Sequence, residues 1–594
     1  MGGASGVGRA GTFPAKYSFD ISAAPSCAND FVVYTTSSSG NPGAAGTFAS
    51  QVGTIVGSST GSFTITNGAR SVALSSSTTQ NTGFFYLSVD GGSMTDAQRA
   101  TNLANAIARN GGTVGVTAST SGSTVTVRAL TYGTGGNSIV VAGNVGGIVF
   151  SQNLTGGAGT AGQPTIIAFR NLYSSCGTGP TIAVPTTYWS YVTGTGAFAE
   201  TSPVISLDGT QVAFVQRTGT VASLVLLKWS GTVSVGNAGA PTAPSSVTLA
   251  NYRSCTAPCM TVMTLSGSPN NTNSSPYYDY TSDVLYVGAN NGTVHKFTGV
   301  FNGTPAESGA PWPVTVLAGT ILSSPVYDST SGLVFVGSQR SGTTGGHLYS
   351  INAAGTVVTS GQLAHDTSTG VSDSPIVDST ARRVYAFVGM DASSNTCGAT
   401  DCRAIYQFRT DLSIAGLTSP KVVIGRGEAT WVQYGGTFDN AYYTSATPAT
   451  PTGNLYVCGS ISGGSSARRP TLWRIPITAN VMGAPVVGPQ LTSNNDADCS
   501  PIMQVKNGAN EYLFMSVNAN GNDTGCTGAC VYSYNLTGLT WNAAAVAAAG
   551  LPAAGGASGM VIDNISAVAG ASQIYYSTLT SPGNAVQASQ AGLN

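Results

Sequence analysis

The sequence predicts a mainly β protein: a β-propeller of seven blades, with eight as the alternative, that carries an inserted small α+β domain. Three observations lead to this fold class. One fifteen-residue pattern recurs along the chain, each copy holds short apolar runs between turn residues, and residues 44–164 interrupt the pattern with a helix signal. Repetition of one supersecondary unit is typical of folds in which neighbouring copies cover each other's apolar faces.

The repeated pattern is clearest in SSPYYDYTSDVLYVG at 274–288 and SSPVYDSTSGLVFVG at 323–337, and two looser copies begin at Thr201 and Asp373. A Ser-Pro step leads into a short apolar strand that ends at Asp. After a turn comes a β-branched and aromatic run, which is typical of a buried strand. In the first copy an Asn-Gly pair, a strong hairpin signal, precedes a third strand. A weaker fourth strand completes an antiparallel unit of roughly 50 to 70 residues, as expected for one propeller blade.

Further copies are expected at both ends of the chain. Later copies start near Phe438, Asp498 and Gly559, while 30–34 and 165–169 read as two strands of one blade that the insertion separates. Seven starts in the C-terminal two thirds of the chain, together with this N-terminal set, favour seven blades with the last built from both termini. Eight blades remain the alternative. Strands shared between the termini would close the ring and remove exposed edges.

Residues 44–164 are predicted to form a separate α+β module. Thr95-Asp96-Ala97-Gln98 has the form of a capping box at the start of a helix. The apolar residues that then fall on one face of this helix are Ala100, Leu103, Ala104, Ile107 and Ala108. The predicted organisation is a flexible N-terminal arm at 1–16, a propeller from 17–43 and 165–594, and the module at 44–164.

Composition restricts the partners of this chain. Only 8% of its 594 residues are charged, and 22 Lys+Arg nearly cancel 23 Asp+Glu. No positive face is therefore expected for nucleic acid. A nearly neutral surface rich in Ser, Thr, Asn and Gly favours association and suits extracellular proteins. The sequence has no run of about 18 apolar residues, so no membrane span is predicted.

The ten cysteines indicate disulfides and an oxidising, extracellular or cell-surface location. The pairs suggested by spacing are Cys255 with Cys259, Cys397 with Cys402, Cys526 with Cys530, and Cys458 with Cys499, which leaves Cys27 and Cys176. The sequence has no CxxC and only three histidines, so the spacing typical of zinc sites is missing. Free buried thiols and a metal site are the less favoured alternatives. The first residues lack an apolar signal segment, so export is expected to use another route or a segment that precedes them.

No set of residues in the sequence indicates a catalytic, cofactor-binding or metal site, and the chain is not expected to be an enzyme. A carboxylate recurs at one position of the repeat, where it usually caps a turn, although a ring of carboxylates would also attract cations. These residues are Asp279, Asp328 and Asp378. His365-Asp366 reads as an exposed loop pair rather than a catalytic base. The oxygen-rich stretch 518–523 is a possible calcium loop, but its closeness to Cys526 favours a loop held by a disulfide.

Residues 274–297, SSPYYDYTSDVLYVGANNGTVHKF, resemble the repeat of quinoprotein-type (PQQ-type) propellers, and the resemblance covers residues 200–400 well and the rest loosely. It implies the propeller fold. Enzymes of that family carry Trp-containing docking motifs in most blades, a vicinal Cys-Cys and a calcium held by Glu, Asn and Asp. This chain has six Trp and no Cys-Cys, so the quinone-enzyme motifs are missing and no cofactor is expected.

The module at 44–164 is similar to a small domain found in phage tail-like and bacterial surface proteins. In that domain a helix of the form A-x-x-L-A-x-A-I precedes a GVTAS segment and a GN-x-I segment, and this chain has all three between 100 and 139. A domain held by both its ends in a propeller loop is expected to project from the ring, where it is placed to contact partners. A neutral decoration is the other interpretation.

These features favour a secreted or cell-surface structural protein that self-assembles, as a filament or coat subunit does. The N-terminal arm and the tail after Tyr576 are expected to add strands to a neighbouring copy. The alternative is an adhesin or glycan-binding propeller, with exposed aromatics drawn from Tyr277, Tyr278, Tyr280, Tyr442 and Tyr443. A quinone-dependent oxidoreductase is the remote alternative. The expected partners are further copies of the chain and, in the alternative, a surface glycan.

Overall fold

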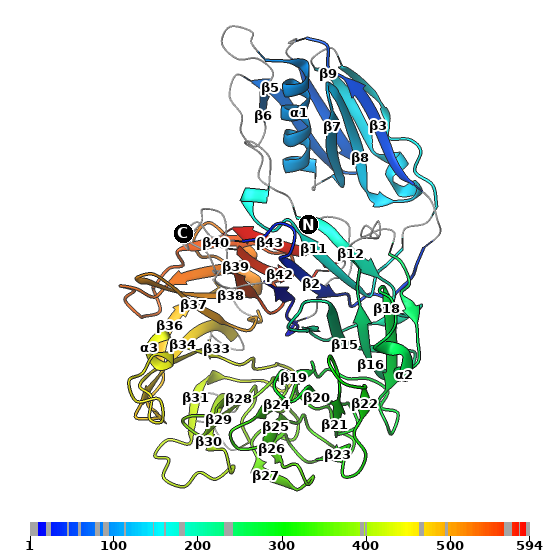
Figure 1. The fold of residues 1–594 in the computed structure, drawn as a ribbon. Helices are drawn as coiled ribbons and strands as arrows, with labels where there is room; N and C mark the ends of the chain where they lie inside the picture. The colour runs from blue at the N-terminus through cyan, green and yellow to red at the C-terminus, as the bar shows by residue number, and fades with distance from the viewer. Residues whose placement is uncertain are drawn as a thin grey trace.

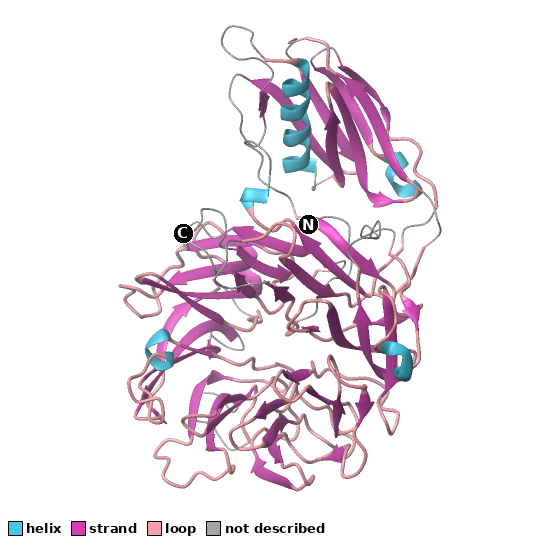
Figure 2. Ribbon diagram, in the orientation of Figure 1, coloured by secondary structure: helices cyan, strands magenta, loops and turns pink. Residues whose placement is uncertain are grey.

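The strands outside the insertion form eight sheets among the described residues, arranged as a ring (Figure 1). The structure is a computed structural model, and it describes residues 10–18, 25–43, 47–57, 61–77, 84–86, 94–111, 114–145, 148–159, 162–176, 185–230, 241–392, 397, 401–462, 468–492, 497–563, 573–580 and 583–589. Strands dominate the fold in Figure 2, and α1 (Asp96–Asn110) is the longest described helix. None of the described helices is long and apolar enough to cross a membrane.

The sheets of the ring are numbered 1 to 8 along the chain. Sheet 1 holds β1 (Ala15–Tyr17), β2 (Phe31–Thr35), β11 (Ile166–Arg170) and β12 (Thr186–Tyr191). Sheet 2 holds β13 (Ala197–Phe198), β14 (Val204–Ile205), β15 (Gln211–Thr218), β16 (Val221–Lys228), β17 (Ser245–Ser246) and β18 (Cys259–Thr264), with α2 (Leu249–Tyr252) before β18. Sheet 3 holds β19 (Tyr277–Asp279), β20 (Val284–Gly288), β21 (Thr293–Thr298), β22 (Ala306–Glu307) and β23 (Val314–Thr315). Sheet 4 holds β24 (Val326–Asp328), β25 (Leu333–Gly337), β26 (His347–Ile351) and β27 (Val357–Gln362).

The second half of the ring follows the same plan. Sheet 5 holds β28 (Ile376–Asp378), β29 (Arg383–Val388), β30 (Cys402–Arg409) and β31 (Lys421–Arg426). Sheet 6 holds β32 (Thr437–Phe438), β33 (Gly453–Ser462), β34 (Arg468–Thr478), β35 (Val481–Met482) and β36 (Val486–Gln490), with α3 (Asn440–Tyr443) between its first two strands. Sheet 7 holds β37 (Met503–Asn507), β38 (Asn510–Gly521), β39 (Gly528–Asn535) and β40 (Ala549–Pro552). Sheet 8 holds β41 (Val561–Asp563), β42 (Gln573–Ser577) and β43 (Ala585–Ser589).

Apolar cores between neighbouring sheets hold the ring together. Phe31 and Val33 of sheet 1 pack with Phe214 of sheet 2, and six further buried clusters join each sheet to the next. The last cluster places Tyr575 of sheet 8 with Val32 of sheet 1. A ring of small sheets in which the last packs on the first is a β-propeller, so the predicted fold class is confirmed.

The preferred count of seven blades, with one built from both termini, differs from the described sheets. β1 pairs with β2 from Ala15↔Val33 onward, and β43 pairs with β42. The strands from the two termini therefore belong to different sheets. Sheets 1 and 8 therefore meet through packed side chains such as Val32 and Tyr575 rather than through paired strands. Outside the insertion, the described residues form eight sheets, which is the number of the alternative.

The flexible arm predicted at 1–16 is wrong for residues 10–16, the part that the structure describes. The carbonyl of Thr12 accepts a hydrogen bond from the Gly559 N–H at 2.8 Å, and the Phe13 N–H donates to Ser202 Oγ at 2.8 Å. The Phe13 ring fits only because residue 559 is glycine: a Cβ there would lie 2.5 Å from it. Residues 1–9 lie outside the described residues. The tail after Tyr576 supplies β43 to its own sheet.

The insertion folds around a core of its own and projects from the ring (Figure 1). One sheet holds β10 (Ile148–Asn153), β9 (Val140–Val145), β4 (Ser62–Asn67), β5 (Arg70–Ser77) and β6 (Phe84–Tyr86), and the other holds β3 (Phe48–Thr54), β8 (Thr124–Tyr132) and β7 (Val116–Ser121). Leu103 and Ile107 of α1 pack with Val127 of β8 in a cluster whose buried members all lie between Ala49 and Leu154.

The predicted helix start and helix face are confirmed in the insertion. The Gln98 N–H donates to Thr95 Oγ1 at 3.3 Å, and the Thr95 N–H donates to Gln98 Oε1 at 2.8 Å, which completes the capping box. Leu103 and Ile107 are fully buried. The neck between insertion and ring is a backbone pair, because Asn41 and Gln163 exchange N–H···O bonds of 2.8 and 2.6 Å.

Candidate functional site

The Ser-Pro step of the repeat has a structural role in the ring. A hydroxyl at this step accepts a hydrogen bond from a backbone N–H of the neighbouring strand. The pairs are Thr201 with Val215 at 3.2 Å, Ser274 with Gly288 at 2.9 Å, Ser323 with Gly337 at 2.8 Å and Ser500 with Ser516 at 2.9 Å. These bonds are buried, so each satisfies a donor that water does not reach.

The serine directly before proline links one sheet to the next. The Ser202 N–H donates to Ser275 Oγ at 2.9 Å, and the Ser275 N–H donates to Ser324 Oγ at 2.8 Å. The N-terminal segment joins this chain of bonds through Phe13 and Ser202. The motif therefore recurs because each of these sheets makes the same connection to the next.

A small cavity lies where the N-terminal segment meets the beginnings of sheets 6, 7 and 8. Its volume is about 150 Å³, and its lining includes Gly11, Trp431, Tyr434 and Asn518. Gly11 has a φ of 80°, and a Cβ at this position would lie 3.0 Å from the Tyr434 ring. Sites for drug-sized ligands usually hold about 300 Å³ or more, so this cavity has room only for a small molecule.

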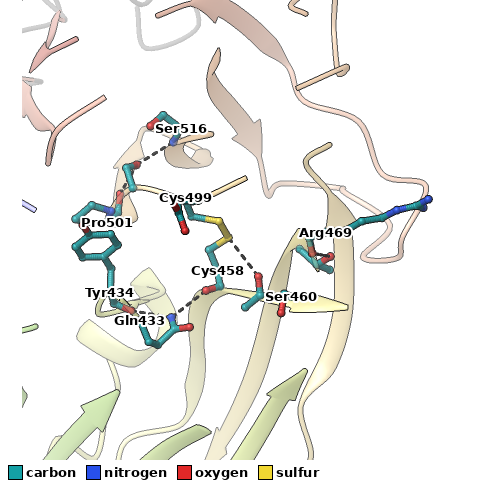
Figure 3. The surroundings of a disulfide bond; sticks show 12 residues. Gln433, Tyr434, Cys458, Ser460, Arg469, Cys499, Pro501 and Ser516 are labelled. Carbon is teal, nitrogen blue, oxygen red and sulfur yellow. Dashed lines mark hydrogen bonds between the residues drawn. A yellow bond between two sulfur atoms is a disulfide. The ribbon is translucent and has the colours of Figure 1, made fainter. Parts of the chain in front are cut away.

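The Cys458–Cys499 disulfide links β33 of sheet 6 to the start of sheet 7 beside this cavity (Figure 3). Gln433 Nε2 donates to the carbonyl oxygens of Cys458 and Tyr434, each at 2.9 Å. Gln433 in turn accepts a 2.7 Å bond from the guanidinium of buried Arg403. The polar groups around the disulfide are thus engaged with one another, and the cross-link connects two sheets.

All ten cysteines form the disulfides that the spacing suggested. The bonds are Cys27–Cys176, Cys255–Cys259, Cys397–Cys402, Cys458–Cys499 and Cys526–Cys530. Every one of them lies outside residues 44–164. The bond between Cys27 and Cys176 spans 149 positions of sequence and so encloses the insertion.

The recurrent aspartates cap turns, as the preferred interpretation had it. Asp279 Oδ1 accepts the Thr281 N–H at 3.1 Å, Asp328 Oδ1 accepts the Thr330 N–H at 3.1 Å, and Asp378 Oδ1 accepts the Ala381 N–H at 2.8 Å. Burial raises the pKa of Asp328, but hydrogen bonds from Ser331 and its neighbours outweigh burial and hold this pKa below the ordinary value.

The other polar motifs identified in the sequence also interact with nearby protein groups. His365 Nδ1 lies 2.8 Å from Asp366 Oδ1, and both side chains are about 40% exposed, as expected for a surface pair. In the oxygen-rich stretch, Asp523 Oδ2 accepts bonds from the Tyr534 hydroxyl at 2.6 Å and the Ala547 N–H at 2.8 Å. Among the described residues, no group of three or more His, Cys, Asp or Glu side chains is placed to hold a metal.

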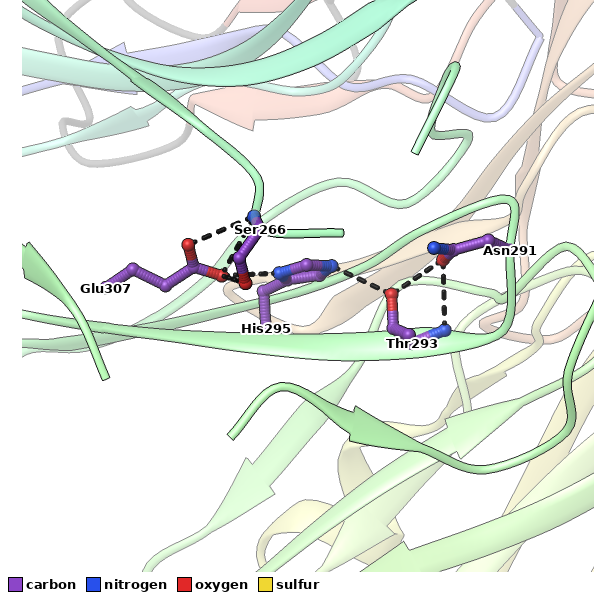
Figure 4. Close-up of polar contacts among 5 residues, drawn as sticks. All are labelled: Ser266, Asn291, Thr293, His295 and Glu307. Carbon is purple, nitrogen blue, oxygen red and sulfur yellow. Dashed lines mark hydrogen bonds and ion pairs between the residues drawn. The ribbon is translucent and has the colours of Figure 1, made fainter. Parts of the chain in front are cut away.

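A hydrogen-bonded relay in sheet 3 was not foreseen from the sequence (Figure 4). His295 is fully buried; its Nδ1 lies 2.6 Å from Glu307 Oε1 and its Nε2 lies 2.8 Å from Thr293 Oγ1. Ser266 binds the same carboxylate through its N–H and hydroxyl. Burial alone would raise the pKa of Glu307, but the hydrogen bonds from His295 and Ser266 lower it.

The order acid, imidazole, hydroxyl is that of a nucleophile activated by a base. Here Thr293 Oγ1 also lies 2.6 Å from Asn291 Oδ1, and the cavities described in this section are lined by other residues. In the fold, the relay joins β21 to the neighbouring strand β22. The antiparallel pairing of β21 with β22 brings His295 to Glu307, 12 positions away. Because this contact depends on strand pairing, no sequence motif predicted the relay.

A larger hollow opens between sheets 5 and 6, where the predicted tyrosines Tyr442 and Tyr443 lie. It holds about 410 Å³ and is bordered by residues 376–380 of one sheet and by Phe438, α3 and two prolines of the other. This hollow is called the aromatic groove below. Its Tyr443 side chain is 63% exposed, whereas Tyr442 is buried and donates its hydroxyl to Asp378 Oδ2 at 2.7 Å.

The other three tyrosines proposed as exposed aromatics differ in their exposure to solvent. Tyr278 is 7% exposed and donates to Asp283 Oδ1 at 2.7 Å. Tyr277 packs against the core between sheets 3 and 4. Tyr280 is 46% exposed, and its hydroxyl donates to the Ile205 carbonyl at 2.8 Å. Exposed aromatic surface is thus found at Tyr443 and Tyr280 only, within this set of five.

Comparison with known proteins gives only weak similarities to solved structures. No family model and no curated protein matches the chain. Among solved structures, dihydro-heme d1 dehydrogenase NirN, in complex with DHE, is 10% identical over 66% of this chain and 64% of that chain, with a TM-score of 0.38. BamB from Moraxella catarrhalis is 12% identical over 68% of this chain and 91% of that chain, with a TM-score of 0.35. This chain therefore spans less than two thirds of the length of NirN.

Proposed function

We propose that this protein is an exported structural scaffold of the cell surface or extracellular space, in which the ring is a rigid platform and the inserted module contacts further copies. The observation that carries the proposal is the module itself, a domain with its own core that projects from the ring on a two-stranded neck (Figure 1).

Two features of the ring support export. Its five disulfides are typical of oxidising compartments. The whole chain has few charged residues and a formal net charge of −1 over 594 residues, and low net charge favours association between copies. The resemblance of the module to a small domain of bacterial surface proteins points the same way.

The proposal assigns the contact between copies to the module rather than to the chain ends. The described parts of both ends are used within the chain: β1 pairs with β2, and β43 pairs with β42. Strand donation by these segments would open sheets 1 and 8. In the module, β7 pairs with β8 alone and lies at the edge of its sheet, and an edge strand offers free backbone groups to another copy.

A second candidate function, an adhesin or glycan-binding propeller, is favoured by a separate observation. The aromatic groove combines an exposed tyrosine with a carboxylate in a hollow of about 410 Å³, which is within the usual size range of ligand sites.

Removal of the module tests the first function. Residues 44–161 are replaced by a short Gly-Ser turn, since the Asn41–Gln163 backbone pair already brings the two neck strands together. Light scattering and electron microscopy at neutral pH are expected to show assemblies for the full chain and single rings for the shortened chain. Assemblies of equal size from both proteins would contradict the module as the contact, and single particles from the full chain would contradict self-assembly.

A further inference from the structure

The aromatic groove has two walls that meet at a right angle. Phe438 and Tyr442 stack with ring centroids 3.9 Å apart and an interplanar angle of 11°, and Tyr443 stands at 89° to Tyr442 with centroids 6.1 Å apart. Tyr443 also stands at 88° to Phe438 with centroids 6.1 Å apart, and because it is 63% exposed, part of its aromatic surface faces solvent. An exposed aromatic ring at a groove offers a flat apolar surface to a ligand.

The polar groups of the groove accept hydrogen bonds more than they donate them. Asp378 receives one bond on each oxygen, from Tyr442 and from the Ala381 N–H. A carboxylate has about four lone-pair sites, so about two remain for a ligand. The Tyr442 hydroxyl is committed as a donor to Asp378, and burial, together with this bond, raises its pKa. A ligand that supplies hydroxyl donors therefore fits best.

The charged residue in the lining of the groove, Asp378, lies opposite Arg383 in the pairing of β28 with β29, so a cationic side chain is already close to it. Arg383 lies close to Asp378: burial lowers the pKa of this guanidinium, and Asp378 is among the groups that oppose the shift. A quaternary ammonium ion usually sits between aromatic walls beside an unneutralised carboxylate. Here the Phe438 and Tyr442 rings are in direct contact, with no space between them, so the groove is unsuited to such a cation.

A proline-rich peptide also fits poorly. It offers carbonyl acceptors and few N–H donors, whereas Asp378 needs donors. Both the apolar surface of Tyr443 and the acceptor at Asp378 suit one ligand class, a molecule with an apolar C–H face and several hydroxyls on its rim.

The walls of the groove are held in place by one buried residue, Asn480, in the turn between β34 and β35. Its Nδ2 donates to the Ala381 carbonyl at 2.9 Å, beside the sheet 5 wall. Its backbone N–H donates to the Pro451 carbonyl at 2.9 Å, in the sheet 6 wall. The Arg383 Nε donates to the Asn480 carbonyl at 3.2 Å. Because one side of the groove is tied to the other, little ordering is required when a ligand binds.

We infer that the aromatic groove between sheets 5 and 6 binds a neutral carbohydrate chain, with Tyr443 stacking on a sugar ring and Asp378 accepting its hydroxyls. This inference rests on the second candidate function and assigns it a site and a ligand class. Tyr443 is the specificity-determining contact, and Asn480 is a positioning residue that acts through both walls.

Affinity electrophoresis of the full chain tests the inference, with gels that contain laminarin, dextran or galactomannan as neutral probes and alginate as an acidic probe. Retardation by at least one neutral polysaccharide and none by alginate is expected. Tyr443→Ala is expected to weaken that retardation about tenfold, a loss of the size that one aromatic contact provides. Tyr443→Phe keeps the ring and is expected to stay within about threefold of the parent.

Tyr280→Ala is the matched control, because Tyr280 is an exposed tyrosine on a turn of sheet 3, outside the groove. It is expected to bind as the parent does. Asn480→Ala and Asn480→Asp both remove the Nδ2 group that donates to the Ala381 carbonyl, and both are expected to weaken binding. Unfolding curves of each variant show whether a loss of binding reflects a loss of folded protein.

The possible results distinguish the groove as the binding site from glycan binding as a function of the protein. Retardation by a neutral polysaccharide that survives Tyr443→Ala would overturn the groove as the site while glycan binding itself stands. Absence of retardation by every polysaccharide would overturn both. Binding of poly-L-proline or choline that Tyr443→Ala abolishes, measured by calorimetry, would overturn the ligand class and keep the groove.

Discussion

The ring and the inserted module bury the apolar faces of their sheets in different ways. Each sheet of the ring needs both neighbours, and the last core, between sheets 8 and 1, joins segments 400 or more positions apart, such as Val32 and Tyr575. The module covers its sheets with one another and with α1, in a core drawn only from residues 49–154.

Cross-links follow this difference. All ten cysteines belong to the ring, and the module has none. A ring closed by long-range contacts has a large loop-closure cost, and disulfides reduce this cost in the unfolded chain. A module whose core is local needs no such help. We therefore expect the two regions to be separate folding units, joined by the paired backbone of Asn41 and Gln163.

The largest effect is expected where the ring closes. Lys16 Nζ lies 2.9 Å from Asp563 Oδ2, and the two side chains are 7% and 0% exposed. Tyr173 donates to the same carboxylate oxygen at 3.1 Å. Asp563→Ala leaves a buried cation unpaired and is expected to lower the free energy of unfolding of the ring by about 3–5 kcal/mol. Tryptophan fluorescence in urea reports this change, because all six Trp lie outside the module.

Asp411→Ala is the control for this prediction, since the Arg409–Asp411 pair is 3.9 Å apart with side chains 44% and 65% exposed. Its cost is expected to be below about 1 kcal/mol, as for most surface pairs. Equal losses in the two variants would show that the buried pair does not hold the ring closed.

The next effect belongs to the module. Leu103 of α1 is fully buried in the module core, and Leu103→Ala is expected to cost about 2–5 kcal/mol there because it leaves a cavity. Hydrogen exchange of peptides from 96–132 should accelerate while the fluorescence transition of the ring stays in place. A matched shift of the ring transition would mean that the two regions unfold together.

The Cys27–Cys176 disulfide, which encloses the module, provides a test of whether ring and module unfold independently. Replacing Cys27 and Cys176 with serine is expected to cost about 2–4 kcal/mol of ring stability. If the module stays folded when the ring unfolds, its ends stay close together, and the cost should be the same in the chain that lacks residues 44–161. A cost about 1 kcal/mol larger in the full chain, as the longer closed loop would give, would contradict independent folding.

A smaller effect is expected at the helix cap. Thr95→Ala removes the hydroxyl that accepts the Gln98 N–H and should cost about 1 kcal/mol in the module, with Thr95→Ser close to the parent. Exchange of the first turn of α1 measures this loss. No difference between the two variants would show that the cap contributes nothing.

Acid is expected to weaken the ring in part through Glu307. Its pKa is lowered from the ordinary value of 4.5 in the folded protein, so its contribution is complete above that value, where the carboxylate is charged in both states. As the pH falls, the unfolded state takes up the proton first, and the contribution is lost through the lowered pKa. Glu307→Gln should flatten the dependence of ring stability on pH between about 3 and 5, measured by urea unfolding. An unchanged slope would show that His295 and Ser266 do not stabilise the charged carboxylate.

Local signals in the sequence predicted most of the elements. The repeat gave the strand pairs of sheets 3 to 5, the capping box gave the start of α1, and cysteine spacing gave the five disulfides. The strand pairs and the capping box depend on residues that are close in sequence, and the disulfides depend on a small number of possible cysteine pairings. The number of sheets was not predictable in the same way, because it depends on whether Ala15 pairs with Val33 or with a strand from the other end.

The groove illustrates the same limit at the level of a site. Tyr442 and Tyr443 stood out in the sequence, but their roles differ: one hydroxyl is bound to Asp378, 64 positions away, and the other side chain is exposed. Asn480 carried no signal, since its importance comes from contacts with two walls that lie in different sheets. Sequence patterns identify residue types, and only packing decides which of them face solvent.

Hydrogen exchange with mass spectrometry, carried out on the full chain in increasing urea, tests the separation of ring and module most directly. We expect two groups of peptides, with those from 96–132 following one urea midpoint and those from sheets 1 and 8 following another. Asp563→Ala should move only the second midpoint. A single midpoint for all peptides, moved as a whole by Asp563→Ala, would show that the ring and the module unfold together.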